Sequence, residues 1–382
     1  MCYVICFALS IFFIYIAQKE FEKKNKKLGI IFSIIGILIP CILAGLRDVS
    51  VGMDVQAYTT RIYNIALNAE SLPSFLSDSW VEVGYSIFIY VIARIFRDIH
   101  WVLFFTELIM CIFIYLTAYE KRKNIPMYLV FFVYFCIFYN TSLSIMRQGI
   151  AMFIIMYSLT KLEKKNYILT IIYFILAVTF HASAIMAIPM YLLIFLSSLN
   201  LDYKKEKKIY IAIFSVLLIT VIFYEPILKL LSCDLHVIPT KYYDYLNSQY
   251  VNSKIDINYT ELLFKLFWIC AYAICVFFNI DKFKKHEYKV NIYFAFLLID
   301  FIVLPISFKI SNASRITFYY GIPGLILLIP YLINSLKNTD IKQLIPKIGM
   351  FAMLLFYWFY SVILYGASNT YPYISDIIPF LK

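Results

Sequence analysis

Apolar runs of membrane-spanning length recur along the whole chain, and this feature limits the fold more than any other. A helix needs about 20 apolar residues to cross the hydrocarbon core of a bilayer, with a range of about 17–25. Runs near this length lie at 1–17, 28–46, 101–119, 125–140, 142–160, 167–182, 184–200, 209–225, 261–280, 290–307, 317–334 and 346–365. The runs are continuous rather than alternating, which favours helices over strands. The sequence therefore predicts an all-α polytopic membrane protein of about 12 transmembrane helices, folded as one integral-membrane domain over residues 1–382.

Composition excludes a water-soluble fold and several classes of function. The chain is 63% hydrophobic and 15% charged, whereas soluble domains are about 45–50% apolar and about 25% charged. The net charge of +11 comes mostly from Lys in short clusters between apolar runs, so we expect no nucleic-acid partner. Cys and His show no metal-ligand spacing, and we expect neither a metal nor a cofactor.

The basic clusters orient the predicted spans. They lie at 19–27, 121–123, 161–165, 204–208, 282–289 and 337–347. Short loops rich in Lys and Arg face the cytoplasm, and with this assignment the spans alternate correctly. The apolar segment 84–96 is too short to cross and would break the alternation, so we expect a re-entrant or interfacial helix there. Two longer loops, 47–83 and 226–260, then face the outside.

Ionisable residues at membrane depth are costly and suggest function. Arg147 lies inside the run expected at 142–160, where burying an arginine costs about 2.5–3.5 kcal/mol on insertion scales. A carboxylate partner or an anionic ligand must offset that cost. His181 follows at the outer turn of a hairpin, either as a hydrogen-bonded structural residue or as a general base or phosphate contact. Arg315 and Asn312 share another outer turn, where several donors suit a phosphate unless Arg315 is only an interfacial anchor.

The first outer loop carries further polar residues. Its sequence from residue 45 to residue 58 is GLRDVSVGMDVQAY. Arg47 ends the second span, Asp48 and Asp54 follow, and Gly52 permits a tight bend between them. Glu82 precedes the short helix at 84–96. Taken alone, this loop is equally compatible with an ordinary solvated loop.

Topology brings the candidate cations to one side. Arg47, Arg147, His181 and Arg315 are far apart in sequence, yet all fall in the outer half of the membrane under the orientation above. Arginine is suited to fixed, bidentate phosphate recognition, whereas the lysines act as topology markers. The implied ligand is an anion, phosphate or pyrophosphate, reached from the outer leaflet.

These motifs resemble the EpsG-like, Wzy-type exopolysaccharide polymerases. The resemblance lies in the loop motif GLRDVSVGMDVQAY, in EVGY at 82–85, in the residues around Arg147 and Gln148, and in FHASA at 180–184. It runs from about residue 25 to about residue 365, and the order and spacing of the motifs carry it. Met53 stands where such proteins are expected to have a small polar residue.

The resemblance implies a polymerase at the outer face of the bacterial plasma membrane. Such proteins transfer a growing glycan from undecaprenyl pyrophosphate to a hydroxyl of the next lipid-linked repeat unit, without nucleotide sugar. The implied partners are undecaprenyl-pyrophosphate-linked oligosaccharide, the lipid bilayer and other assembly proteins such as a flippase and a chain-length regulator. The expected pyrophosphate contacts are Arg147, Arg315, Arg47 and Gln148; the candidate bases are His181, Asp54 and Glu82; the other expected substrate contacts are Asp48, Tyr58, Tyr85, Ser183 and Asn312.

Two other functions remain open at this stage. One is a glycosyltransferase that uses a polyprenyl-phosphate sugar, or an O-antigen ligase-like transferase, with Asp48 or Asp54 as its acidic motif. The other is a flippase or another transporter of lipid-linked oligosaccharide. A transporter favours polar groups at the bilayer midplane and internal repeats, whereas the polar groups here lie toward one face.

Overall fold

The computed structural model describes residues 1–199, 203–234, 258–279, 288–309 and 314–378, and their regular secondary structure is helical throughout. Seven helices are long and apolar enough to cross a membrane: Cys2–Glu22, Lys26–Gly45, Ile99–Lys121, Tyr259–Phe278, Val290–Phe308, Thr317–Ser335 and Ile341–Leu364. The prediction of an all-α, multi-pass membrane protein is thus confirmed. The count of 12 spans stays a prediction.

Several predicted spans are shorter or broken helices. They are α7 (Met127–Ile137), α8 (Tyr139–Ser142), α9 (Met146–Glu163), α10 (Tyr167–Phe180), the 3₁₀ turn η2 (Ala182–Ala187) and α11 (Ile188–Ser197). The helix α12 (Tyr203–Ile222) has 20 residues and overlaps the span expected at 209–225. The predicted short helix at 84–96 exists as α5 (Val83–Phe96), and at 14 residues it is too short to span a bilayer upright. Its re-entrant or interfacial position stays a prediction.

The chain divides into two compact units. Unit 1 comprises Met1–Ile185 and Ile329–Lys382, and unit 2 comprises Met186–Leu328. Unit 2 contains α11, α12, α13 (Tyr224–Lys229), η3 (Leu230–Asp234), α15 (Tyr259–Phe278), α17 (Tyr288–Lys309) and most of α18 (Ser314–Ser335). The expected single domain over residues 1–382 stays a prediction.

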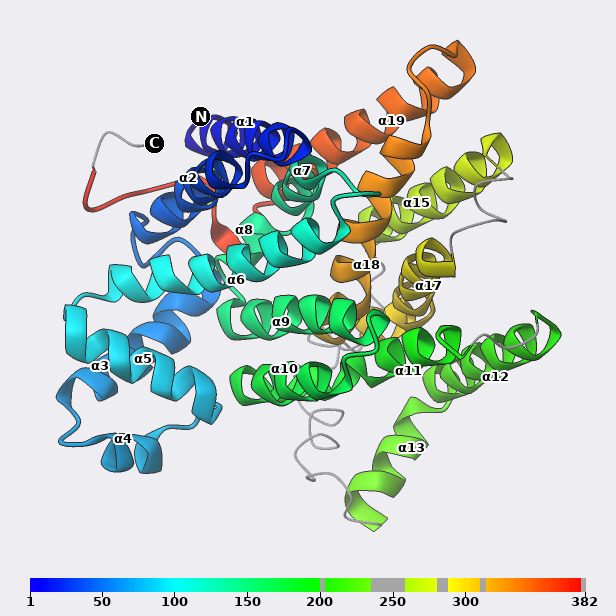
Figure 1. Cartoon of the computed structure of the whole chain (residues 1–382). Coiled ribbons are helices and arrows are strands. Elements are labelled where there is room, and N and C mark those ends of the chain that lie inside the picture. The colour runs from blue at the N-terminus through cyan, green and yellow to red at the C-terminus, as the bar shows by residue number, and fades with distance from the viewer. Residues whose placement is uncertain (200–202, 235–257, 280–287, 310–313, 379–382) are drawn as a thin grey trace. The chain divides into compact units, whose positions relative to one another are not determined.

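Unit 1 is a bundle in which neighbouring helices pack in pairs. The helix α1 (Cys2–Glu22) packs on α2 (Lys26–Gly45), α2 on α6 (Ile99–Lys121), α6 on α9, and α9 on α10 (Figure 1). The helix α7 packs on α1 and on α19 (Ile341–Trp358). Buried apolar side chains fill this bundle, and α9 is almost entirely buried. A helix that is apolar all round is expected at the centre of such a bundle.

The first predicted outer loop folds into short helices. They are η1 (Val55–Thr59), α3 (Thr60–Asn68) and α4 (Leu72–Asp78), and both α3 and α4 pack against α5. Of the second predicted loop, residues 235–257 lie outside the described residues. That both loops face the outside stays a prediction.

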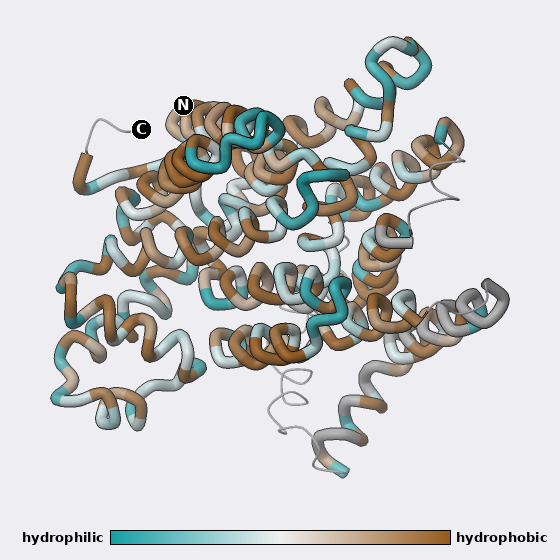
Figure 2. Tube along the Cα trace, viewed as in Figure 1, coloured by the Kyte–Doolittle hydropathy of each residue, from teal (hydrophilic) through white to brown (hydrophobic). Residues whose placement is uncertain are grey.

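One end of unit 1 collects the basic turns. Lys161 Nζ lies 2.9 Å from Glu120 Oε1, and Lys121 pairs with Glu163, so the turns after α6 and α9 are adjacent. The side chain of Asn334 donates to the backbone oxygen of residue 124. Figure 2 shows hydrophilic residues at the turns after α1, α6 and α9. The helix α9 ends at these lysines, so its first residues lie at the opposite end of unit 1.

Candidate functional site

A break in the helices sets the position of Arg147. Helix α7 ends at Ile137, the single turn α8 follows, and α9 begins only at Met146. The sequence placed a continuous span at 142–160, with Arg147 well inside it. The structure corrects this start, because residues 143–145 are not helical. Arg147 is therefore in the first turn of α9, at the end of unit 1 opposite the lysines.

Close packing brings α5 to the end of α10. A Cβ atom built on Gly84 would lie 2.8 Å from the backbone oxygen of Thr179 and 2.5 Å from its Oγ1. Only glycine allows the backbone of α5 to approach this closely. Glu82 immediately precedes α5, and His181 immediately follows α10. The same contact therefore delivers a carboxylate and an imidazole to one place.

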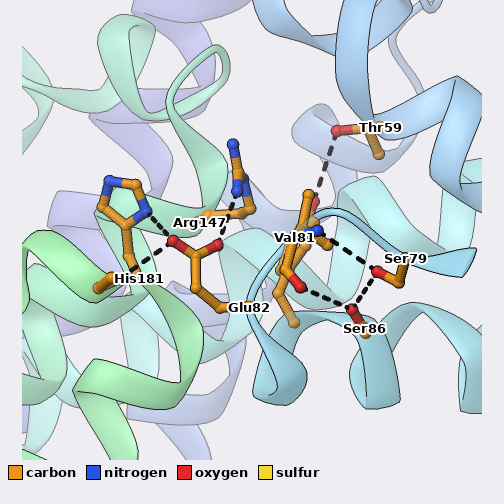
Figure 3. A network of polar contacts seen from close by, with 9 residues as sticks. Thr59, Ser79, Val81, Glu82, Ser86, Arg147 and His181 are labelled. Carbon is orange, nitrogen blue, oxygen red and sulfur yellow. Dashed lines mark hydrogen bonds and ion pairs between the residues drawn. The ribbon is translucent and has the colours of Figure 1, made fainter. Parts of the chain in front are cut away.

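The carboxylate of Glu82 joins groups from two other parts of the chain, around residues 147 and 181 (Figure 3). Its Oε2 accepts a hydrogen bond from Arg147 Nη1 at 2.7 Å. Its Oε1 lies 2.9 Å from His181 Nδ1 and accepts from the backbone N–H of Ala182 at 3.1 Å. Glu82 is thus a carboxylate partner of Arg147, one of the two kinds of group expected to offset the cost of its burial.

The charges in this group hold Glu82 ionised. Burial by itself raises the pKa of the Glu82 carboxyl, but the hydrogen bond to His181 and the charge of Arg147 outweigh it and lower the pKa to about 2. A carboxylate of such low basicity, with both oxygens engaged, is a poor proton acceptor. Of the three candidate bases, Glu82 is therefore suited to orient its neighbours.

Two of the partners keep unused hydrogen-bonding capacity. The side chains of Arg147, Glu82 and His181 are 25%, 20% and 23% exposed. Within the described residues, Arg147 uses only Nη1 for a hydrogen bond, which leaves Nη2 and Nε for a ligand. A carboxylate only accepts, so His181 Nδ1 carries a proton toward Glu82, and Nε2 is the ring nitrogen that Glu82 does not engage. In Figure 3 that second ring nitrogen points away from Glu82.

An exposed tyrosine lies over the guanidinium. The Arg147 Cζ atom is 5.9 Å from the centre of the Tyr58 ring, and Tyr58 is 45% exposed. Tyr85 lies beneath the surface instead, with its hydroxyl 3.4 Å from Thr59 Oγ1. Tyr58 is therefore at the surface beside Arg147, and its contact with a substrate stays a prediction, whereas Tyr85 packs at the start of α5. The expected substrate contact of Tyr85 is not supported by this placement.

Arg47 has a structural placement. It is 1% exposed, and its guanidinium donates three hydrogen bonds to backbone oxygens. Nε donates to Val51, Nη1 to Ala44 at 2.7 Å, and Nη2 to Leu143 at 3.0 Å. A buried guanidinium needs such partners to offset its desolvation. The expected role of Arg47 in holding pyrophosphate is not supported, because its donors already fix the first loop against the helix break.

The other residues of the first loop lie around the same break. Asp54 donates its backbone N–H to Ser144 Oγ at 3.2 Å. Asp48 caps its own turn, since its Oδ1 accepts from the N–H of Ser50 at 2.7 Å. Gly52 has φ +106°, and a Cβ there would lie 2.6 Å from the backbone oxygen of Leu143. The bend predicted at Gly52 is confirmed.

The remaining predicted contacts are placed as follows. Ser183 lies in η2, two residues after His181. Gln148 follows Arg147 and is buried in the bundle. Arg315 lies in the first turn of α18, in unit 2, and Asn312 lies outside the described residues. Contact of these four residues with a substrate stays a prediction.

Two buried polar groups were missed by the sequence analysis. In unit 1, Glu107 of α6 accepts from the hydroxyls of Tyr134 and Ser142 at 2.5 Å and 3.1 Å. In unit 2, Lys265 Nζ lies 2.8 Å from Asp300 Oδ1, and both residues are buried. A single acid or lysine within an apolar run is the signal that reveals such groups. In the described ranges, no cluster of three or more His, Cys, Asp or Glu has the geometry of a metal site.

Comparison with protein-family models shows to which family the chain belongs. The model described as the EpsG family matches residues 30–375. The chain belongs to the EpsG family. No curated protein and no solved structure matches it. Membership in the EpsG family, together with the apolar helices, indicates a membrane function of the exopolysaccharide-polymerase type.

The contact at Gly84 leads to a prediction for this EpsG family chain. In Gly84→Ala the new methyl overlaps the backbone of α10, and such overpacking costs about 1–3 kcal/mol. We expect α5 to move away from α10, Glu82 to lose His181, and polymer yield in cells to fall by about 10- to 100-fold at unchanged protein level.

Gly349→Ala is the matched control. Gly349 also lies in a helix, α19, but a Cβ atom there meets nothing within 4 Å. We expect this variant to make polymer at the normal level. Normal polymer from Gly84→Ala would show that the close approach of α5 and α10 is not needed for activity.

Proposed function

We propose that this chain is a polysaccharide polymerase that transfers a growing glycan from undecaprenyl pyrophosphate to a lipid-linked repeat unit at the outer face of the bacterial plasma membrane. The observation that carries the proposal is the bridging of Arg147 and His181 by the Glu82 carboxylate. An anion-binding group and a proton acceptor are the two components that transfer from a pyrophosphate needs. Family membership supports the class of reaction.

Arg147 is the proposed contact of the donor pyrophosphate. Glu82 holds one side of its guanidinium at 2.7 Å, so Nη2 and Nε present a fixed pair of donors to an anion. Negative charge grows on the pyrophosphate as the glycosidic bond breaks. A fixed cation stabilises that charge more in the transition state than in the bound donor, which accelerates the transfer.

His181 is the proposed general base. Its Nδ1–H donates to Glu82, which fixes the ring and directs the Nε2 lone pair elsewhere. The acceptor hydroxyl gives its proton to Nε2 while its oxygen bonds to the anomeric carbon. The bond from that carbon to the pyrophosphate oxygen breaks, and undecaprenyl pyrophosphate leaves. Asp54 also remains a candidate base near the helix break.

The proposed orientation follows from the basic turns. The turns after α6 and α9 are rich in lysine and lie together at one end of unit 1. The positive-inside rule assigns that end to the cytoplasm. The Glu82 group, at the opposite end of α9, then faces the outside, where lipid-linked repeat units are polymerised. The proposal retains 12 spans with α5 as a re-entrant or interfacial helix.

Reconstitution tests the proposed function. The purified chain is reconstituted in liposomes and incubated with undecaprenyl-pyrophosphate-linked repeat units isolated from its own bacterium. The products are then separated by length. We expect a ladder of glycans and one released undecaprenyl pyrophosphate per bond formed, with both lost in His181→Gln.

The other functions give different results in the same assay. A single addition to each acceptor would identify a one-step transferase or ligase. Movement of intact lipid-linked units across the bilayer, with no new glycosidic bond, would identify a transporter. Either result would overturn the polymerase proposal.

A further inference from the structure

Several side chains in the last part of the chain are as buried as those of the core. After α19 and the π-helical turn η6 (Phe359–Leu364), the short turn η7 (Ala367–Asn369) leads into an extended segment. Thr370, Tyr373 and Ser375 in that segment are buried, at 0%, 2% and 5% exposure. Terminal segments are poorly ordered unless something ties them down. We call residues 369–375 the C-terminal strap.

Backbone hydrogen bonds join the strap to the first loop. The N–H of Asp48 donates to the backbone oxygen of Ile374 at 2.9 Å. The N–H of Gly52 donates to the backbone oxygen of Asn369 at 3.1 Å. The strap therefore engages both ends of the turn that carries the family-like motif.

Side-chain hydroxyls of the strap add contacts to the end of α2. Tyr373 donates its hydroxyl proton to the backbone oxygen of Leu43 at 2.8 Å. Ser375 donates to the backbone oxygen of Leu46. Leu43 lies in the last turn of α2 and Leu46 is its C-cap, where the helix itself supplies no partner for the carbonyls. The strap thus caps α2 at the point where the first loop begins.

The strap also binds the helix break. Thr370 Oγ1 accepts from Asn140 Nδ2 at 3.0 Å, and the backbone oxygen of Thr370 accepts from the Tyr3 hydroxyl at 2.7 Å. The other end of the Asn140 amide accepts from Trp358 Nε1 at 3.0 Å. In Figure 1 the red segment after α19 lies beside α8, which contains Asn140.

The first loop in turn bonds to the residues that precede Arg147. Arg47 ties this loop to the backbone oxygen of Leu143, and Ser144 accepts from the N–H of Asp54. Residues 143 and 144 lie directly before α9, whose second residue is Arg147. The strap, the first loop and the break are joined by hydrogen bonds as far as Ser144, which lies three residues before the proposed pyrophosphate contact.

We propose that the C-terminal strap positions the first loop and the start of α9 for glycan transfer, with Thr370 and Tyr373 as its principal positioning residues. This inference rests on the proposed polymerase function only for its effect on catalysis. Its structural part, that the strap holds the first loop closed, is independent of the reaction.

The test combines a variant of the strap with a reporter of loop opening. The double variant Thr370→Val/Tyr373→Phe, called the loosened strap, removes two hydroxyls at nearly constant volume. The reporter is Val51→Cys, at a first-loop position that is 2% exposed, and the matched reporter is Ile125→Cys, 3% exposed in the turn after α6. Maleimide modification of each position is measured on the full-length chain in membranes by peptide mass spectrometry.

We expect the loosened strap to raise modification at position 51 by about 10- to 100-fold, since each lost buried hydrogen bond favours local opening. Modification at position 125 stays unchanged, and glycan transfer falls by about tenfold. Thr370→Ser, which keeps the hydroxyl, retains protection and transfer. Thr117→Val removes a buried hydroxyl that bonds only its own helix, to Phe113, and leaves both reporters unchanged.

Three results would overturn the inference. Unchanged modification at position 51 would show that the strap does not hold the loop, whatever happens to activity. Equal increases at positions 51 and 125 would show general unfolding. Increased modification at position 51 with normal transfer would show that the strap holds the first loop but has no role in glycan transfer. If the unmodified chain makes no polymer, the proposed function fails, and the modification rates still decide the structural part.

Discussion

Glu82→Gln will abolish polymer formation while the protein still inserts and accumulates normally. Glutamine keeps the shape of the side chain but removes the charge that holds Arg147 at 2.7 Å and orients His181 at 2.9 Å. General-base catalysis contributes about 100- to 10,000-fold, and we expect a fall in transfer rate of that size. The measurement is the initial rate of bond formation in liposomes, with glycan length scored by electrophoresis.

Glu120→Gln is the matched control for this charge removal. Glu120 also pairs with two cations, Lys161 and Lys164, but at the opposite end of unit 1. Partly exposed ion pairs contribute about 0–1 kcal/mol, so we expect transfer within about twofold of the unmodified chain. Equal activity in the two variants would remove Glu82 from the mechanism.

The defect of Glu82→Gln will still be present at pH 5. The pKa of Glu82 is lowered from 4.5 to about 2 in the folded chain. The stabilisation that its ionised form provides is therefore present above the unfolded value of 4.5 and is lost only as pH falls toward 2. A defect that disappears at pH 5 would show that Glu82 is already protonated there, contrary to this arrangement.

Arg147→Lys will lose nearly as much activity as Arg147→Ala, although lysine keeps the charge. Lysine can replace the ion pair with Glu82, but it lacks the planar fork that presents Nη2 and Nε together. Loss of one fixed donor to a developing anion costs about 100- to 1,000-fold in rate. We expect a fall of this size in kcat, measured on the same lipid-linked donor, with protein level and insertion unchanged.

Arg94→Lys provides the comparison. Arg94 also lies beside a tyrosine ring, with its Cζ 5.2 Å from the centre of Tyr90, but it does not contact Glu82. We expect normal transfer from this variant. Full activity in Arg147→Lys would reduce the site to a point charge, and normal-length polymer from Arg147→Ala would exclude Arg147 from the reaction.

The order of helices could be predicted from sequence because apolar run length is a local property. The seven membrane-length helices and the short α5 coincide with predicted segments. The break before α9 was missed, although residues 138–145 contain the polar residues Asn140, Thr141, Ser142 and Ser144 between more apolar neighbours. The carbonyl of Leu143 accepts from Arg47, and the hydroxyl of Ser142 lies 3.2 Å from the hydroxyl of Tyr134; both contacts exist only after the bundle has formed.

The two arginines Arg47 and Arg147 show most clearly what a sequence leaves open. Arg47 was expected at the end of one apolar run and Arg147 inside another, and both were expected to hold pyrophosphate. In the fold, Arg47 is enclosed by three backbone carbonyls, whereas Arg147 meets Glu82 at a partly exposed surface. The difference arises from which groups surround each guanidinium, and that depends on helices far away in the chain.

The sequence by itself determined the helical membrane class, the basic turns and the set of ionisable residues opposite them, because hydropathy and charge act over neighbouring residues. Tertiary structure decided that Glu82 joins partners 65 and 99 positions away, and that the C-terminal strap closes over the first loop. Such pairings depend on the packing of α5 against α10 and of the strap against α2 and α8. No local pattern specifies them, since each requires distant backbones to meet within hydrogen-bond distance.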